Sequence, residues 1–452
     1  MFPRTENALK SALHIFLTTK NREIQTRHRS NAIVPCVWSV KQYDISPKSE
    51  LVQNKFRMKR LTVKSMKKKN KILKRVLILL SIFIVLLLIL MAILFLFIFK
   101  KPTQVNDFSK TELNKWNKIT LDSSVKSGDG SEYYLLTKRG ASNKWMIFFS
   151  GGGMNWDDAS TASPITVSSI LHGEALTYFT NIPFYKVGTM GGILEADNKR
   201  NPFHDWNFVY IPYSTGDFHM GNNTVTYEKN NKTHISYHNG KTNVLACLNW
   251  FFKNVTQPDK IFVCGESAGG FGAAFWTPYI ARHEVNTQIF EYSDSSYITT
   301  DRWASIVDSY WNADFENTFG YEPKSDIITT ALSYDAVACP NITFLQSNTL
   351  YDSLLINFQK RLNGVQTDDS EYKHIWSEQM LHSAKKLAAN YKNYNYFITD
   401  YSLDSKKGTT PHTLSAADSF YNAKEEDISL CNWLFNSVEN GLRKCVGTEF
   451  IQ

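Results

Sequence analysis

The stretch IFVCGESAGGFGAAF, from Ile261 to Phe275, constrains this chain more than any other part of it. It begins as a short apolar strand, passes through a Gly-x-Ser-x-Gly turn centred on Ser267 and enters a helix rich in small residues. A turn this tight leaves no space for bulky neighbours, which explains the glycines on both sides of the serine. The pattern predicts a strand–turn–helix unit that holds the Ser267 hydroxyl at a helix N-terminus, the arrangement of a serine nucleophile.

A chance match is the alternative, because Gly-x-Ser-x-Gly also occurs in loops without chemistry. Here the motif has the required apolar strand before it, and Ala268, Gly270 and Gly272 after it would let the helix pack close to a sheet. The helix dipole and the free N–H groups of the first turn would then stabilise a developing oxyanion. We therefore predict that Ser267 is a nucleophile.

The segment from Val76 to Phe99 contains 24 residues without a charge. About 20 apolar residues suffice to cross a bilayer, so this segment is long enough to span one with some tilt. A core helix would be shorter and would carry a polar face, and a cleaved signal peptide would be shorter and nearer the N-terminus. We predict a transmembrane signal anchor over residues 76–99.

Charge is distributed unevenly around this segment. Residues 1–75 hold 19 of the 50 Lys/Arg and 4 of the 42 Asp/Glu, so the remainder has 31 basic and 38 acidic residues and is acidic overall. The net charge of +8 therefore gives no support for binding to nucleic acid. Ten Lys/Arg lie between Arg57 and Arg75, which predicts a cytoplasmic N-terminus and a translocated C-terminal part in the secretory pathway or at the cell surface.

This topology divides the chain into four parts. We expect a basic, largely disordered cytoplasmic tail over residues 1–75, the anchor over 76–99, a stalk over 100–124 and a lumenal or extracellular domain over 125–452. The translocated part contains four Asn-x-Ser/Thr sequons, which we expect to be surface glycosylation sites. Their asparagines are Asn222, Asn231, Asn254 and Asn341.

Cysteine usage fits the same topology. Of the six cysteines, Cys36 is expected on the cytoplasmic side and five lie beyond the anchor, an odd number that leaves at least one thiol free. Cys264 lies within the apolar strand before Ser267 and should be a buried thiol. Cys431 and Cys445 are close in sequence, and we predict a disulfide between them.

A glycine cluster, Gly151 to Gly153, directly follows the strand pattern Lys144–Ser150. Read alone, it is an ordinary turn at the end of a strand. Combined with the Ser267 motif, it resembles the Gly-Gly-Gly loop that supplies half of the oxyanion hole in esterases. We predict that the backbone N–H groups of Ala268 and of Gly152 or Gly153 bind the oxyanion.

Several blocks together resemble the pectin acetylesterase/Notum family of α/β-hydrolases over most of residues 125–415. The resemblance implies a mostly parallel sheet with helices on both faces, ester hydrolysis and no metal or organic cofactor. Family members have Trp and Cys after the glycine loop, whereas this chain has Met154 and Asn155. Met154 and Asp294 are expected at the substrate pocket. The blocks, in order, are GDGSEYYL, NKWMIFFSGGG, NPFHDWNFVYIPYSTGD, KIFVCGESAGGFGA and EYSDSSY.

A serine nucleophile needs a base held by a carboxylate, and in α/β-hydrolases the chain order is Ser, acid, His. Asp352 follows the strand pattern Asn341–Gln346 and matches the family's acid position. Asp294 is a second candidate for the acid and Asp335 a third. Asp352 could instead be only the N-cap of the helix that begins at Ser353.

The base is expected on a loop after the last strand of the sheet. Tyr394–Thr399 has a strand pattern, and the loop beyond it contains His412, the only histidine after His382. A lone histidine near a C-terminus is usually a surface residue, but this position favours a catalytic base. His204 and His219 are interpreted as ordinary polar loop residues, because no metal-ligand spacing surrounds them.

The resulting hypothesis is a membrane-anchored serine carboxylesterase that acts on an acylated glycan or an acylated protein. The resemblance leaves open acetyl esters on polysaccharides, which we favour, and a longer acyl group on a secreted signalling protein. A third reading is an inactive hydrolase-fold ectodomain that only binds its ligand. Such degenerate domains usually lose the serine, the histidine or the glycines, and this chain keeps all of them.

Overall fold

The computed structural model describes residues 48–98, 101–166, 177–229 and 231–451. The chain forms two compact units, residues 1–97 and residues 98–452. Cys36 and the rest of the predicted tail before residue 48 lie outside the described residues.

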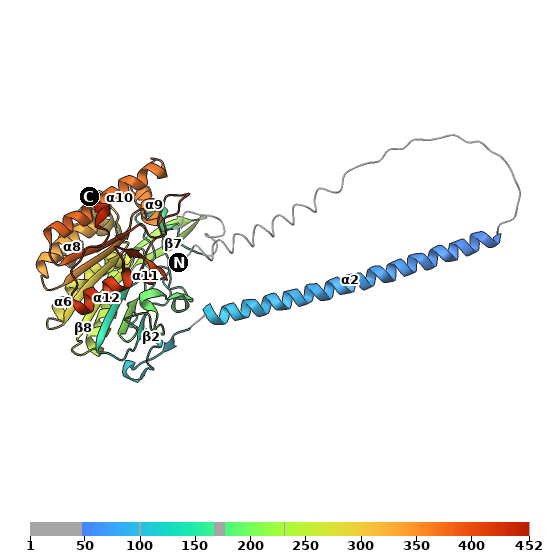
Figure 1. Cartoon of the computed structure of the whole chain (residues 1–452), viewed down its shortest axis with the longest axis horizontal. Coiled ribbons are helices and arrows are strands. Elements are labelled where there is room, and N and C mark those ends of the chain that lie inside the picture. The colour runs from blue at the N-terminus through green and yellow to red at the C-terminus, as the bar shows by residue number, and fades with distance from the viewer. Residues whose placement is uncertain (1–47, 99–100, 167–176, 230, 452) are drawn as a thin grey trace. The chain divides into compact units, whose positions relative to one another are not determined.

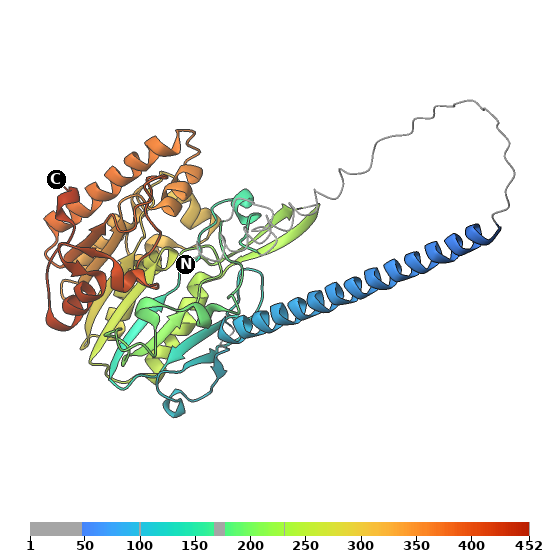
Figure 2. The same ribbon diagram turned by 45° about the vertical axis from the view of Figure 1, so that its right-hand side comes forward.

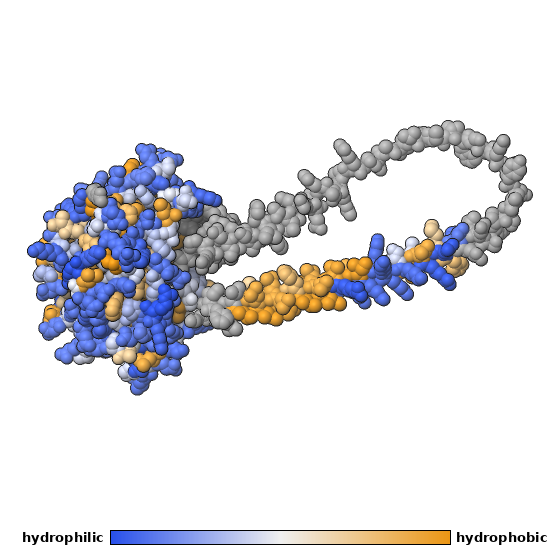
Figure 3. All heavy atoms as spheres, viewed as in Figure 1, coloured by the Kyte–Doolittle hydropathy of each residue, from blue (hydrophilic) through white to orange (hydrophobic). Residues whose placement is uncertain are grey.

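The first unit contains one long helix, α2 (Lys48–Ile98, 51 residues). Its N-terminal half is basic and its C-terminal half is apolar, as Figure 3 shows by the change from blue to orange. The apolar half is long and hydrophobic enough to cross a membrane, and its described side chains are exposed. Residues 48–75, which the sequence placed in a largely disordered tail, belong to this same helix.

The second unit is built on one nine-stranded mixed sheet with the order β1-β2-β3-β5-β4-β8-β9-β10-β11 (Figures 1 and 2). The six strands from β5 to β11 run parallel, whereas β3 is antiparallel to both β2 and β5. This is the predicted α/β class. The strands are β1 (Thr103–Gln104), β2 (Trp116–Thr120), β3 (Tyr134–Lys138), β4 (Lys144–Phe149), β5 (Asn207–Ile211), β8 (Lys260–Glu266), β9 (Gln288–Asp294), β10 (Thr343–Thr349) and β11 (Tyr394–Thr399).

The expected stalk over residues 100–124 is not a linker, because β1 and β2 belong to the sheet. Side chains alternate between buried and partly exposed along β2, with Ile119 in the core. Phe108, between the two strands, packs against Trp145 of β4 with ring centroids 5.3 Å apart. The alternation is only five residues long and includes two lysyl or asparaginyl positions, so it is weak as a sequence signal.

Helices cover both faces of the sheet. One core cluster contains apolar residues of α5, α6, α8, α9 and α10, and the other contains those of α11 and α12. The α-helices are α3 (Asp158–Thr161), α5 (Gly240–Asn254), α6 (Ala268–His283), α7 (Phe315–Phe319), α8 (Ile327–Ala338), α9 (Ser353–Leu362), α10 (Asp369–Asn390), α11 (Ser419–Asn422) and α12 (Leu430–Asn440). Short 3-10 turns cover Phe108–Lys110, Lys186–Thr189, Gly192–Leu194 and Thr448–Ile451, and a π-helix covers Ser305–Tyr310.

Two hairpins complete the described structure. Strands β6 (Asn223–Lys229) and β7 (Lys232–His238) form one antiparallel pair, and β12 (Lys424–Glu425) and β13 (Ile428–Ser429) form the other. Helix α5, which precedes β8 in the chain, begins at Gly240, shortly after β7 ends at His238.

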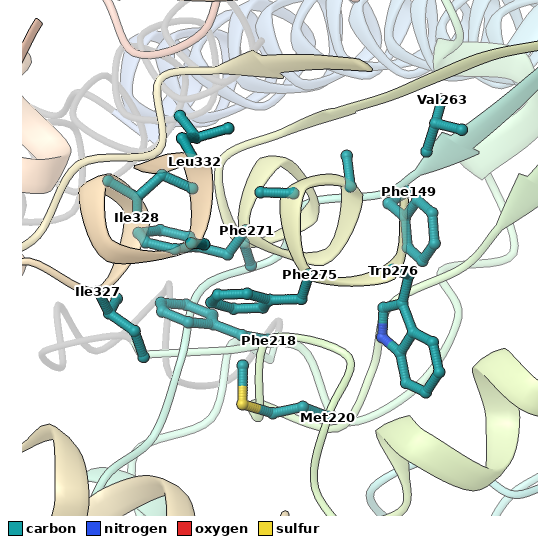
Figure 4. Packing of buried hydrophobic residues seen from close by; sticks show 14 of the residues in the cluster. Phe149, Phe218, Met220, Val263, Phe271, Phe275, Trp276, Ile327, Ile328 and Leu332 are labelled. Carbon is teal, nitrogen blue, oxygen red and sulfur yellow. The ribbon is translucent and has the colours of Figure 1, made fainter. Parts of the chain in front are cut away.

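Helix α6 packs in the core directly after Ser267 (Figure 4). Phe271 stacks on Phe218 at 4.1 Å between ring centroids, and Phe275 and Trp276 extend the same aromatic cluster. The small residues bring the start of the helix against the sheet. A Cβ on Gly269 would lie 2.0 Å from the Phe149 carbonyl oxygen, so only glycine allows this approach.

Candidate active site

Ser267 lies between β8 and α6 in a backbone conformation that non-glycine residues seldom adopt, with φ 55° and ψ −126°. Its N–H donates to the carbonyl oxygen of Asp294 at 2.7 Å, and its own carbonyl oxygen accepts from Gly270 at 3.0 Å. The side chain is only 7% exposed. These contacts form the strained turn that the motif predicted, with the serine as N-cap of α6.

The glycine loop after β4 lies against this turn. A Cβ on Gly151 would lie 2.9 Å from Cβ of Ser267 and 2.5 Å from the Glu266 carbonyl oxygen, so a larger residue would push the loop away. Gly153 has φ +84°, where L-residues are strained. Within the described residues, the N–H groups of Gly152, Gly153 and Ala268 donate to no protein acceptor. These three donors near Ser267 are the groups that the sequence proposed for an oxyanion hole.

Asp352 and His412 are brought together from the ends of β10 and β11. The His412 Nδ1 atom lies 2.6 Å from Oδ2 of Asp352, which is fully buried. The other carboxylate oxygen accepts from the N–H groups of Leu354 and Leu355, both at 3.0 Å. Asp352 is therefore both the N-cap of α9 and the partner of His412, so the two readings left open by the sequence describe the same carboxylate.

The protonation of His412 follows from this contact. Burial would lower its pKa, but the charge and hydrogen bond of Asp352, with the more remote charges of Asp294 and Glu266, raise the pKa above its ordinary value. With Nδ1–H donating to Asp352, the neutral ring carries its lone pair on Nε2. Nε2 is buried and has no hydrogen-bond partner among the described residues, and it is not bonded to Ser267. Such catalytic bonds are often long before substrate binds.

Asp294, which the resemblance placed at the substrate pocket, is held by hydrogen bonds from a neighbouring loop. Its side chain is fully buried, and Oδ2 accepts from the N–H groups of Leu414 and Ser415 at 2.8 and 2.7 Å. It does not contact His412 by any hydrogen bond described for the chain, so it is also not the acid partner. Asp335, the third candidate acid, lies in α8 with both carboxylate oxygens unpartnered in the described structure.

Met154, the other residue expected at the substrate pocket, is buried in the core. It is 1% exposed and belongs to the core cluster on the α6 side of the sheet. Its N–H donates to the Thr177 carbonyl oxygen, which pairs the segment after the glycine loop with residues 177–179. An apolar side chain in this position packs into the core, and no local sequence pattern encodes which way it points.

The expected disulfide is absent, because both Cys431 and Cys445 are free thiols. Cys431 is buried in the cluster beneath α12, whereas Cys445 packs against the cluster on the other face of the sheet. Closeness in sequence therefore does not bring the two sulfur atoms together. The asparagines of all four sequons are exposed, as glycosylation would require.

His204 and His219 both have structural partners. Nδ1 of His204 lies 2.8 Å from the Asn201 carbonyl oxygen. Nε2 of His219 lies 2.9 Å from that of Ser150, directly before the glycine loop, and burial lowers the His219 pKa to about 4. Within the described residues, there is no group of three or more His, Cys, Asp or Glu that could hold a metal ion. The sequence had not indicated that His219 supports the glycine loop.

The fold and these loops define an α/β-hydrolase with its polar groups gathered at the carboxyl ends of the parallel strands. Residues 118–310 match the family Pectinacetylesterase. The palmitoleoyl-protein carboxylesterase NOTUM of the planarian Schmidtea mediterranea is 27% identical over 207 residues, which are 44% of this chain and 34% of that protein. The match thus spans about a third of the relative's length. The family match and this relative both support the resemblance to the pectin acetylesterase/Notum family that the motifs indicated.

Solved structures agree on the fold. Two crystal forms of the Wnt deacylase Notum from Drosophila superpose with TM-scores of 0.50 and 0.51, at 18% and 19% sequence identity. The superpositions cover 73% of this chain and 94% and 95% of those chains. At this level of identity, the similarity concerns the fold alone.

Proposed function

We propose that this chain is a serine carboxylesterase with Ser267 as nucleophile, His412 as base and Asp352 as the acid that orients the base. The observation that carries the proposal is the 2.6 Å contact between Asp352 and His412, with the buried Nε2 atom of His412 left without a partner among the described residues. Nε2 would accept the Ser267 proton as Oγ attacks an ester carbonyl. The N–H groups of Ala268 and of Gly152 or Gly153 would bind the oxyanion.

The remaining steps follow from the same groups. His412 returns its proton to the departing alcohol, and an acyl-enzyme remains on Ser267. Water, deprotonated by His412, then attacks the acyl carbonyl, and Ser267 leaves with the proton. In this scheme every proton passes through Nε2, and Asp352 keeps Nδ1–H in place throughout.

We propose O-acetyl groups of a glycan as the substrate. The family match supports this, and so does the crowding beside the glycine loop. A Cβ on Gly152 would lie 2.9 Å from the Tyr213 ring and 3.3 Å from the Phe179 ring, which favours a small acyl group. The relative named as a palmitoleoyl-protein carboxylesterase supports the alternative, a deacylase of a lipid-modified protein.

We further propose that α2 anchors the enzyme as a single-pass membrane protein with the hydrolase domain on the lumenal or extracellular side. The apolar half of α2 and the basic residues before it support this topology. The exposed sequon asparagines are consistent with it.

Hydrolysis of a chromogenic ester series from acetate to dodecanoate, by the detergent-solubilised full chain, tests both the activity and the acyl preference. We expect turnover that is greatest at acetate and is lost in Ser267→Ala. A maximum at long chains would favour the lipid deacylase. No turnover with any ester by the folded protein would indicate a binding domain.

A further inference from the structure

We propose that Asp294 is a positioning residue that fixes the His412 loop at a set distance from Ser267. This inference rests on the proposed function and adds a residue to it that touches neither the substrate nor the reacting atoms. Asp294 is the last residue of β9, between the strand that ends at Ser267 and the strand that leads to Asp352.

The main chain of this segment holds the nucleophile. The Asp294 carbonyl oxygen accepts the Ser267 N–H at 2.7 Å. The Ser296 hydroxyl lies 2.8 Å from the Ser267 carbonyl oxygen and 3.0 Å from that of Asp294, and it joins the two turns again. Hydrogen bonds from the end of β9 and the residues after it therefore hold the strained turn at Ser267 in place.

The side chain of Asp294 holds the loop of the base. Its Oδ2 atom accepts the N–H of Leu414 at 2.8 Å and both the N–H and the hydroxyl of Ser415 at 2.7 Å. The preceding N–H, that of Thr413, donates to the Ser295 hydroxyl at 3.2 Å. Three consecutive N–H groups after His412 are therefore bound by the last residue of β9, Asp294, and the next residue, Ser295.

The same carboxylate is also linked to the strand that carries the acid. Oδ1 accepts the Ser347 hydroxyl at 2.8 Å, and the Ser295 N–H donates to the Ser347 carbonyl oxygen at 2.8 Å. Ser347 of β10 lies opposite Asp294 in the sheet. Asp294 thus joins the three loops that bear Ser267, Asp352 and His412.

The backbone next to His412 needs such a restraint. Thr413 has φ +61°, Ser295 φ +51° and Ser267 φ +55°, all in the region that L-residues avoid. Strain of this kind persists only where surrounding contacts over-determine the backbone conformation. Without the Asp294 acceptor, we expect the loop to relax, and a displacement of about 1 Å at the reacting groups can cost on the order of 100-fold in rate.

Two substitutions separate positioning from charge. Asp294→Ala removes the three bonds that its carboxylate makes to the loop and should lower kcat by about 100-fold, with KM for a short ester within about threefold. Asp294→Asn should recover kcat to within about tenfold, because its oxygen can accept from Leu414 and Ser415 while its NH2 faces two hydroxyls that can accept. Loss of the negative charge in Asp294→Asn should also move the acid limb of the kcat/KM profile to lower pH.

The matched control is Glu291→Gln. Glu291 is also fully buried on β9, three residues earlier and on the opposite face of the sheet. The substitution should therefore leave kcat and the pH profile unchanged. Assays use the solubilised full chain, with near-UV circular dichroism and melting temperature as checks of folding. If Asp294→Ala cannot be recovered folded, Ser415→Ala, which removes one donor to Oδ2, should still lower kcat several-fold.

Three results would overturn the inference. Folded Asp294→Ala with kcat within threefold of the parent would show that the carboxylate is not needed. Equal losses in Ala and Asn with an unmoved pH limb would indicate a general packing role. An unchanged kcat in folded Ser415→Ala would likewise show that this bond to Oδ2 of Asp294 is not needed. An inactive parent protein, or activity that survives in Ser267→Ala, would instead remove the proposed function itself.

Discussion

Strand β9 carries two fully buried carboxylates, Glu291 and Asp294, in opposite surroundings. An odd spacing along a strand turns their side chains to opposite faces of the sheet. Asp294 accepts hydrogen bonds from the His412 loop and from neighbouring hydroxyls. Glu291 accepts only from the Ser293 hydroxyl, and its Oε2 atom has no partner among the described residues. The Asp294 carboxylate is surrounded by hydrogen-bond donors, whereas the Glu291 carboxylate is influenced by the charge of a second acid.

That second acid is Asp335 of α8, whose two oxygens are also unpartnered in the described structure. Burial raises the pKa of Glu291 and of Asp335 well above the ordinary range. The charge of Asp335 raises the pKa of Glu291 further, whereas the charge of Arg282 lowers that of Asp335. The comparison teaches that burial alone keeps an acid neutral, whereas donors built around a carboxylate stabilise its charge. Hydrogen-bond donors stabilise the charge of Asp294 at the candidate active site, whereas Asp335 of α8 has no such donor among the described residues.

The largest expected effect concerns Asp352, a buried carboxylate that, like Asp294, accepts hydrogen bonds from backbone N–H groups. Asp352→Asn keeps an oxygen for the N–H groups of Leu354 and Leu355 but presents NH2 to His412, which favours the wrong tautomer of the imidazole. We expect kcat for a short ester to fall by about 10⁴-fold with little change in stability.

Asp368→Asn is the control for this change, because Asp368 is the exposed N-cap of α10 and should be neutral for activity. A kcat for Asp352→Asn above a tenth of the parent value would contradict the role given to Asp352.

A smaller effect is expected from the glycine loop. In Gly151→Ala the new methyl group would lie 2.9 Å from Cβ of Ser267, so the loop and its N–H donors should move away from the oxyanion. Loss of one such donor costs about 100- to 1,000-fold in kcat. Gly441→Ala tests backbone strain alone, because its φ is +68° and a Cβ there meets nothing within 4 Å.

Gly441→Ala should lower the melting temperature without changing kcat. Equal kcat losses in the two variants would show that the effect at Gly151 is general strain and not displacement of the oxyanion donors.

The sequence predicted most of what local patterns determine. Strand β11 and the turn around Ser267 were placed correctly, because apolar runs and glycines report on the backbone directly. The contact between Asp352 and His412 was reached through chain order. The roles of Asp294 and Met154 were not, because the direction of a buried side chain depends on partners about 120 residues away, or on a neighbouring segment, that no local pattern encodes.

Two predictions at the edges of the domain were also wrong. β1 and β2 were assigned to a stalk, since their short alternation is hidden by lysines and asparagines, and Cys431 and Cys445 were paired on closeness alone. Which face of a sheet a residue reaches is set by the fold as a whole.

The smallest expected effect concerns stability and the Glu291 carboxyl, whose pKa is raised by burial. A carboxyl whose pKa is raised by folding binds more protons in the folded state than in the unfolded state. Stability is then fully present below the unfolded pKa near 4.5 and falls as the pH rises toward the folded pKa. Glu291→Gln removes this proton linkage, because an amide does not titrate. We expect the free energy of unfolding to fall less steeply between pH 5 and pH 8, by up to about 1.4 kcal/mol per pH unit. Chemical denaturation across that range measures the slope, with the exposed Glu378→Gln as control. An unchanged slope in Glu291→Gln would mean that Glu291 is charged in the folded protein, and the contrast with Asp294 would then rest on geometry alone.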